Sequence, residues 1–152
     1  MNETYVIREI AYGSAEYRAE LELRDAVLRR PLGRQLSAKD TENENAAIHL
    51  ACFLGERLIG CLVLRPLADA EIRMRQVAVA TEMQRQGFGA ALVNHAETTA
   101  RERGFHRMVL NARETAVPFY EKHGYARCGP RIDILTIPHW EMEKQLDDGP
   151  NK

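Results

Sequence analysis

One short run of residues, Gln84-Arg85-Gln86-Gly87-Phe88-Gly89, constrains this chain more than any other feature. It lies between an apolar, strand-like stretch at 77–79 and a helical pattern at 90–103. A strand that passes through a Gly-rich loop into a helix aims several unpaired backbone N–H groups, and the positive end of the helix dipole, at one point. Gly87 and Gly89 let the backbone approach an anion closely and tolerate positive φ angles. The run therefore predicts a phosphate-binding loop.

Two better-known Gly-rich loops fit this run poorly. A P-loop needs Lys followed by Ser or Thr after its last Gly, and Ala90-Ala91 stand there. The dinucleotide fingerprint needs an acidic residue about 20 residues further on. That part of the chain reads Met108-Val109-Leu110. A nucleotide-binding protein is therefore disfavoured, and an ordinary surface turn before a helix is the simplest remaining alternative.

The loop and the strand before it resemble motif A of the GNAT superfamily, the GCN5-related N-acetyltransferases, whose signature is Q/R-x-x-G-x-G/A. In that family the loop binds the pyrophosphate of acetyl-coenzyme A. The chain departs from the common pattern at Thr81, where many members have Pro, and at Arg85, where many have Gly. Neither change removes a backbone N–H donor of the loop itself.

A second segment carries the resemblance further along the chain. Asn111-Ala112-Arg113 and the run at 117–125, which contains Phe119-Tyr120, resemble motif B, an F-Y-x-x-x-G-F/Y segment. The two motifs cover about residues 71–129, and two motifs at the right separation are far more specific than either alone. The stretches 74–79 and 137–139 further resemble small bacterial GNAT proteins of largely unassigned substrate.

The resemblance implies an α/β (α+β) fold with a mixed, mostly antiparallel central sheet and helices on both faces, as in the acyl-CoA N-acyltransferases. In that fold the strands matching 71–79 and 107–111 splay apart and admit the pantetheine arm of acetyl-CoA, which serves as co-substrate. The implied cofactor-binding residues are Val77, Ala78, Val79, Gln84, Arg85, Gln86, Gly87, Phe88, Gly89, Ala90, Asn111 and Phe119.

Two side chains are candidates for proton transfer. Tyr120 stands where many members of the family carry the general acid, and a phenol with a pKa of about 10 suits a leaving thiolate. Its alternative role is that of a core aromatic. His139 suits a general base, because imidazole changes its protonation near neutral pH. A structural role for His139, or Glu71 or an ordered water as the base, stays open.

The predicted function is that of an acetyl-CoA-dependent N-acetyltransferase that moves the acetyl group to a primary amine of an unidentified small molecule or protein by direct attack. The alternative is a catalytically silent acyl-CoA-binding or regulatory module.

Arg73 and Arg75 share one face of their strand. They could select an acidic acceptor or pair with surface carboxylates.

The pattern of residues predicts alternating strands and helices. Ser14 is a suitable N-cap for a helix that ends at Pro31-Leu32-Gly33, and Gly55-Glu56-Arg57 signals a hairpin turn. Gly129-Pro130 is expected to separate the closing strands at 125–128 and 132–144. Four arginines are expected on the solvated faces of the first helix: Arg18, Arg24, Arg29 and Arg30.

Composition sets the outer limits. The 152 residues, 45% of them hydrophobic, predict a single domain over 1–146 with a flexible tail at 147–152. A net charge of −1 gives no reason to expect nucleic acid or membrane as a partner, and a homodimer is left open. Cys52, Cys61 and Cys128 lack metal-site or disulfide spacing, so they are expected in the core, without a metal. These features and an N-terminus without a targeting pattern predict a cytoplasmic protein.

Overall fold

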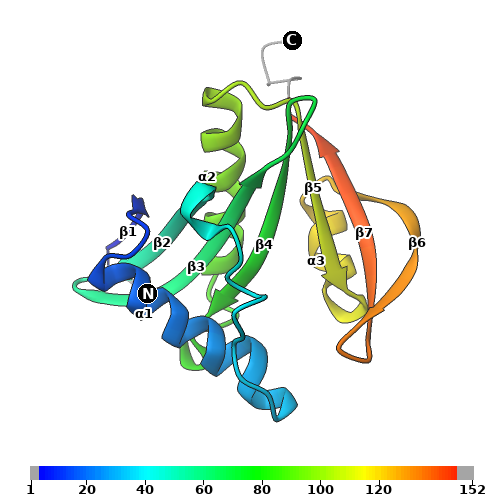
Figure 1. Ribbon diagram of the computed structural model, residues 1–152. Helices are drawn as coiled ribbons and strands as arrows, with labels where there is room; N and C mark the ends of the chain where they lie inside the picture. The colour runs from blue at the N-terminus through cyan, green and yellow to red at the C-terminus, as the bar shows by residue number, and fades with distance from the viewer. Residues whose placement is uncertain (1–3, 147–152) are drawn as a thin grey trace. The chain divides into compact units, whose positions relative to one another are not determined.

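The computed structural model describes residues 4–146 (Figure 1). The predicted tail at 147–152 lies outside the described residues. Within them the chain forms strands β1 (Tyr5–Ile10), β2 (Ile48–Leu54), β3 (Arg57–Pro66), β4 (Glu71–Val79), β5 (Arg107–Arg113), β6 (Ala126–Ile134) and β7 (Ile137–Gln145), and helices α1 (Ala15–Arg24), α2 (Phe88–Glu102) and α3 (Val117–Lys122).

The strands form one seven-stranded sheet in the order β1-β2-β3-β4-β5-β7-β6. The pairs β1 with β2, β2 with β3, β5 with β7 and β6 with β7 are antiparallel. The parallel ladder between β4 and β5 joins Glu71, Ile72 and Arg73 to Arg107, Met108 and Val109. The mixed, mostly antiparallel sheet predicted from the sequence is therefore confirmed.

The chain divides into two compact units. Unit 1 comprises the chain up to Arg65 together with Gln76–Ala96, and unit 2 comprises Pro66–Arg75 together with the chain from Glu97 onward. Both β4 and α2 contribute residues to each unit. The single domain over 1–146 stays a prediction. None of the helices in residues 4–146 is long and apolar enough to cross a membrane.

Unit 1 is built around the neighbouring strands β2 and β3. The β2 side chains alternate between the two faces of the sheet, as the pleat requires. His49 contacts Glu20 of α1, whereas Cys52 belongs to the face on which Gly60 meets Leu92 of α2. A Cβ at Gly60 would lie 2.9 Å from Leu92 Cδ1. Gly60 therefore lets α2 pack directly on the strand, and helices cover both faces of this unit.

The first helix begins where the sequence predicts. The Ser14 hydroxyl accepts the Tyr17 N–H at 3.1 Å and so caps α1. The helical path continues through a π-helical turn, Asp25–Arg29, and a 3₁₀ turn, Arg30–Leu32. It ends at Gly33, whose φ of 70° is a left-handed conformation that glycine adopts without a steric penalty.

One of the four arginines expected on the surface is instead completely buried. Arg24 has 0% exposure and lies in a cluster of buried polar groups with Glu20 and Glu44. Its guanidinium donates to Glu20 Oε2 at 2.7 Å and to Glu44 Oε1 and Oε2 at 2.8 and 2.6 Å. The prediction for Arg24 is wrong because the loop after α1 brings Glu44 over the helix, which no local pattern signals.

The same cluster holds a histidine between two acceptors. His49 Nδ1 lies 3.1 Å from Glu20 Oε2, and His49 Nε2 lies 2.9 Å from the Glu44 carbonyl oxygen. Two acceptors require both ring nitrogens to donate, which only the imidazolium does. Burial opposes this charge, but the hydrogen bond to Glu20 and its negative charge outweigh burial and raise the pKa of His49. Two cations, Arg24 and His49, thus balance two carboxylates.

The closing hairpin of unit 2 differs from the prediction. Strand β6 runs without a break through Gly129-Pro130, which falls in a register irregularity between Arg127 and Arg131. The turn lies instead at Leu135 and Thr136, whose φ angles are 52° and 64°. Positive φ at both central residues is what a tight hairpin needs. The sequence does not predict this turn, because neither residue is Gly, Asn or Asp, the types that usually adopt such φ angles.

One cysteine also departs from expectation. Cys52 and Cys61 are buried, and burial raises the pKa of each thiol, that of Cys52 to about 11. Cys128 is exposed, because it belongs to the irregular stretch of β6. The prediction that all three lie in the core is therefore wrong for Cys128.

The buried cluster gives a test of the fold. Replacing Arg24 with Met leaves the carboxylates of Glu20 and Glu44 buried without their cation, so the free energy of unfolding should fall by about 3–5 kcal/mol. Arg8→Met is the matched control, because Arg8 pairs with Glu16 at an exposed site. It should change stability far less. Urea unfolding measures both, and equal losses for the two variants would contradict the account.

Candidate active site

The Gly-rich run forms a loop that opens directly into α2. After β4 the chain makes a 3₁₀ turn, Thr81–Met83, and α2 begins at Phe88. The Ala91 N–H donates to the Gly87 carbonyl oxygen at 3.0 Å as part of the first helical turn. The N–H groups of Phe88, Gly89 and Ala90 therefore belong to the helix terminus, where no such intrahelical partner exists.

The local charge and space favour an anion at this helix terminus. The first turn of α2 carries no acidic residue. A Cβ built on Gly87 meets no atom within 4 Å, so the space beside the loop is open. Gly87 has a φ of 92°, as predicted for this loop. Gly89 lies inside α2 and has no positive φ, because the helix begins at Phe88, two residues before the predicted start at Ala90.

The loop is braced by its own glutamines. Gln84 Nε2 donates to the Val79 carbonyl oxygen at 2.9 Å, and Gln86 Nε2 donates to that of Glu82 at 3.4 Å. Glu82 also pairs with Arg57 at the start of β3. The glutamine side chains thus fix the loop, which leaves the backbone N–H groups as its contribution to an anion site.

The strand that leads into the loop is irregular at one residue. Gln76 has a φ of 55° within β4, so the strand is locally kinked as in a β-bulge. Its side-chain Oε1 accepts the Arg24 Nε–H at 3.1 Å. The predicted residues Val77, Ala78 and Val79 follow directly, and Ala78 is buried.

Tyr120 occupies a buried position in α3. Its ring packs edge-on against Phe119 at 5.0 Å and against Tyr125 at 5.7 Å between ring centroids. Burial raises the pKa of Tyr120 to about 12. The phenol therefore stays protonated at neutral pH, and it is a weaker acid than the ordinary tyrosine that the sequence suggests.

His139 lies on β7, where it pairs in register with Arg113 of β5. It is 9% exposed, and its Nδ1 lies 2.8 Å from the Ile137 carbonyl oxygen. The carbonyl oxygen accepts a hydrogen bond from Nδ1, so the proton of the neutral ring is on Nδ1. Nε2 is therefore the nitrogen that can accept a further proton. Asn111 is exposed and pairs in register with Glu141.

Two groups considered for the chemistry already have ionic partners. Glu71, an alternative base, pairs with Arg107. Arg73 Nη2 lies 3.4 Å from Glu141 Oε2. Arg73 therefore pairs with a carboxylate of the protein itself, which is one of the two roles that the sequence leaves open.

The predicted site residues fall into two sets. Unit 1 holds the three β4 residues and the loop with the start of α2. Unit 2 holds Asn111, Phe119, Tyr120 and His139. The sequence does not mark Gln76 or Arg24 as neighbours of the candidate site. The left-handed conformation of Gln76 within a strand leaves no local signal, and neither does the ion pair of Arg24 with a distant segment.

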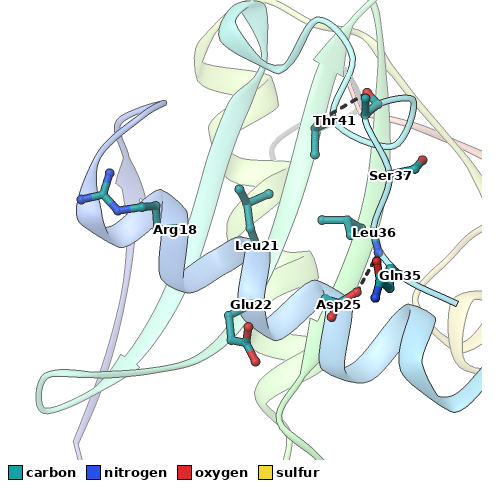
Figure 2. Close-up of a pocket in the computed structure, with 9 residues that line it drawn as sticks. Arg18, Leu21, Glu22, Asp25, Gln35, Leu36, Ser37 and Thr41 are labelled. Carbon is teal, nitrogen blue, oxygen red and sulfur yellow. Dashed lines mark hydrogen bonds between the residues drawn. The ribbon is translucent and has the colours of Figure 1, made fainter.

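A separate pocket of about 490 Å³ lies in unit 1 between α1 and the loop that follows it (Figure 2). Its lining shares no residue with the predicted site. Asp25 Oδ1 accepts the Leu36 N–H at 2.7 Å, which holds the loop against the helix. The two acidic residues of the lining, Glu22 and Asp25, both pair with Arg30. The pocket therefore shows no unpaired carboxylate that would mark a site for a cation.

Within residues 4–146, one group of side chains has the composition of a metal site. Single ligand atoms of Glu20, Glu44 and His49 lie within 4.8 Å of one another. The Arg24 guanidinium donates to both carboxylates, and His49 donates to Glu20. The positive charge that this acidic pair requires is thus supplied by the protein.

The architecture of the sheet is that of the acyl-CoA N-acyltransferases. The crystal structure of a Lactobacillus plantarum protein superimposes on this chain with a TM-score of 0.86 at 28% identity, over 94% of this chain and 99% of that one. That protein is described as an N-acetyltransferase. A GNAT family acetyltransferase from Elizabethkingia anophelis, solved with acetyl-CoA bound, shares the fold with a TM-score of 0.73 at 17% identity, over 93% of this chain and 98% of that one.

The model of the acetyltransferase (GNAT) family matches residues 11–125, so the chain belongs to this family. The uncharacterized N-acetyltransferase YjcF of Bacillus subtilis is 31% identical over 104 residues, which are 68% of this chain and 74% of that protein. The prediction of an acetyl-CoA-dependent N-acetyltransferase is confirmed at the level of the enzyme class.

The left-handed backbone of the loop predicts different effects on stability for substitutions at Arg85 and at Gly87. Arg85 has a φ of 65°, which costs an ordinary L-residue about 1–2 kcal/mol. Arg85→Gly should relieve this strain and leave stability unchanged or raised by up to about 1 kcal/mol after the entropy of glycine is counted. Gly87→Ala should lower stability by about 1 kcal/mol, because its φ is 92°. Thermal unfolding compares the two, and losses of equal size would contradict the left-handed loop.

Proposed function

We propose that this protein transfers the acetyl group of acetyl-CoA to a primary amine of a small molecule or a protein by direct attack. The observation that carries the proposal is the helix terminus of α2. There, a loop with left-handed residues at Arg85 and Gly87 precedes a first turn without acidic residues. This arrangement suits a phosphate group, since the helix dipole and the unpaired N–H groups act together.

The residues of the loop fit the pyrophosphate of acetyl-CoA. The backbone N–H groups from Arg85 to Ala90 would hold it, since that of Gln84 already donates to the Thr81 carbonyl oxygen, and the open space at Gly87 leaves room for a phosphate oxygen. The acetyl-CoA seen in the Elizabethkingia anophelis relative supports this choice of cofactor. When bound, acetyl-CoA supplies a thioester that is activated toward amines. Asn111 and Phe119 are proposed as further cofactor contacts on the resemblance of their motif.

The chain's own groups would assist the transfer at two points. A backbone N–H from residues 77–79 would stabilise the negative charge that develops on the acetyl oxygen. Tyr120 would donate a hydrogen bond to the leaving thiolate. With a pKa of about 12 it is a weaker acid than a thiol, whose ordinary pKa is about 8.5. Stabilisation by the hydrogen bond is therefore its main contribution.

His139 is the proposed proton acceptor for the attacking ammonium. The hydrogen bond from Nδ1 to the Ile137 carbonyl oxygen keeps Nε2 as the basic nitrogen. The imidazole of His139 is a better candidate than Glu71, because the Glu71 carboxylate already pairs with Arg107. The catalytically silent acyl-CoA-binding module remains the alternative, and thiol release from acetyl-CoA across a panel of amines separates the two.

The cofactor loop gives a binding test. The protein should bind acetyl-CoA and coenzyme A but bind pantetheine, which lacks the pyrophosphate, much more weakly. Gly87→Asp should abolish coenzyme A binding, because it puts a negative charge beside the phosphate. Calorimetry measures these affinities, with Gly104→Asp as a control at another glycine of positive φ. Coenzyme A binding by a folded Gly87→Asp variant within about threefold of wild type would refute the phosphate site.

Tyr120 gives a test of the chemistry. Tyr120→Phe keeps the ring packing but removes the donor, so kcat should fall by about 10²-fold while acetyl-CoA affinity stays nearly unchanged. Tyr125→Phe is the matched control, since this second buried tyrosine bonds to Glu97 instead. It should lower stability and spare kcat. Steady-state kinetics under conditions where chemistry limits turnover decide between the roles, and a normal kcat for Tyr120→Phe would make it a packing residue.

A further inference from the structure

A hydrogen bond joins the buried cluster of unit 1 to β4, the strand of the proposed acetyl site. Arg24 donates all of its guanidinium hydrogens to acceptors from four segments of the chain. Besides Glu20 of α1 and Glu44 of the 3₁₀ turn Glu44–Ala46, these are the Asp40 carbonyl oxygen at 3.4 Å and Gln76 Oε1 at 3.1 Å. Gln76 is the partner that belongs to β4.

Gln76, the β4 partner of Arg24, also has a strained backbone conformation. Gln76 has a φ of 55° inside a strand, a left-handed conformation that is strained for a non-glycine residue. A residue stays in such a conformation only where its surroundings enforce it. The hydrogen bond from Arg24 to the Gln76 amide supplies this enforcement, because Arg24 itself is held rigidly by two carboxylates.

The kink has a direct consequence for the next peptide group. A residue in a bulge turns the following backbone out of the regular ladder and re-aims its polar groups. The residue after Gln76 is Val77, the first of the proposed acetyl-binding residues. The orientation of the Val77 N–H is therefore coupled to the conformation of Gln76.

We propose that Arg24 and Gln76 are positioning residues, which hold the kink of β4 so that the Val77 N–H is aimed at the acetyl carbonyl. The inference rests on the proposed function, since it assigns these residues to the same acetyl site. The balance of charge in the cluster serves this role. Glu20, Glu44 and His49 hold the guanidinium in place without a net charge that would draw water in.

Gln76→Met tests the proposal, because it keeps the length of the side chain and removes the acceptor. We expect kcat to fall at least tenfold while the coenzyme A dissociation constant stays within about twofold, since the loop at Gly87 is untouched. Gln76→Glu restores an acceptor for Arg24 and should recover most of kcat. Gln145→Met makes the same change at an exposed position of β7 and should leave kcat unchanged.

A second readout does not depend on turnover. In the ¹⁵N–¹H spectrum of the protein without cofactor, the Val77 amide signal should move in Arg24→Lys, which keeps a cation beside the carboxylates but removes the Nε–H donor to Gln76 at a position distant in the sequence. A purely structural role predicts lower stability with an unchanged kcat and an unmoved Val77 signal, and that result would overturn the proposal.

The two proposals fail in different ways. If wild-type protein neither binds acetyl-CoA nor acetylates any amine, the proposed function fails, and the Val77 signal still reports whether Arg24 and Gln76 set the kink. If wild-type protein is active, Gln76→Met keeps its kcat and Arg24→Lys keeps the Val77 signal, the positioning role fails while the proposed function stands.

Discussion

The structure of unit 1 depends on the burial of one guanidinium. A fully buried arginine is costly unless every donor finds an acceptor, and Arg24 meets this condition with partners on α1, the following loop and β4. The loop contributes Glu44, which also accepts the Tyr17 hydroxyl at 2.7 Å. The position of α1, the course of the loop and the kink of β4 are therefore determined together.

The second determinant is the transition from β4 into α2. Gly60 allows α2 to pack closely on β3, and the side chains of Gln84 and Gln86 bond back to the backbone before the loop. Because the helix is anchored and the loop is braced, the donors at the helix terminus are preorganised. A preorganised set of N–H groups binds an anion without paying for their ordering at that moment.

The sequence predicts the features that local chemistry controls. Ser14, Gly33 and Gly55 mark a cap, a helix end and a hairpin turn, and the structure has each of them where expected. Glycines placed between a strand and a helix predict the proposed phosphate-binding loop by the same kind of reasoning.

The features that the sequence does not predict depend on contacts between distant segments. Arg24 has the local pattern of a surface residue and is buried only because Glu44 folds over it. Gln76, Leu135 and Thr136 adopt left-handed conformations that are typical of glycine, so no residue type marks them. The sequence therefore predicts the turn of the closing hairpin at Gly129-Pro130, the conventional turn signal, although the chain turns six residues later. Among the proposed catalytic residues, Tyr120 is predicted from the resemblance of motif B rather than from any local pattern.

The most direct test of the central claim is a titration of ¹⁵N-labelled protein with coenzyme A, followed by backbone amide chemical shifts. Saturable shifts should be largest for the amides from Arg85 to Ala90, since these groups would hold the pyrophosphate. Pantetheine should leave these particular signals nearly unmoved. Binding of coenzyme A with unperturbed signals at Gly87, Phe88 and Gly89 would contradict the account, because the cofactor would then be held elsewhere.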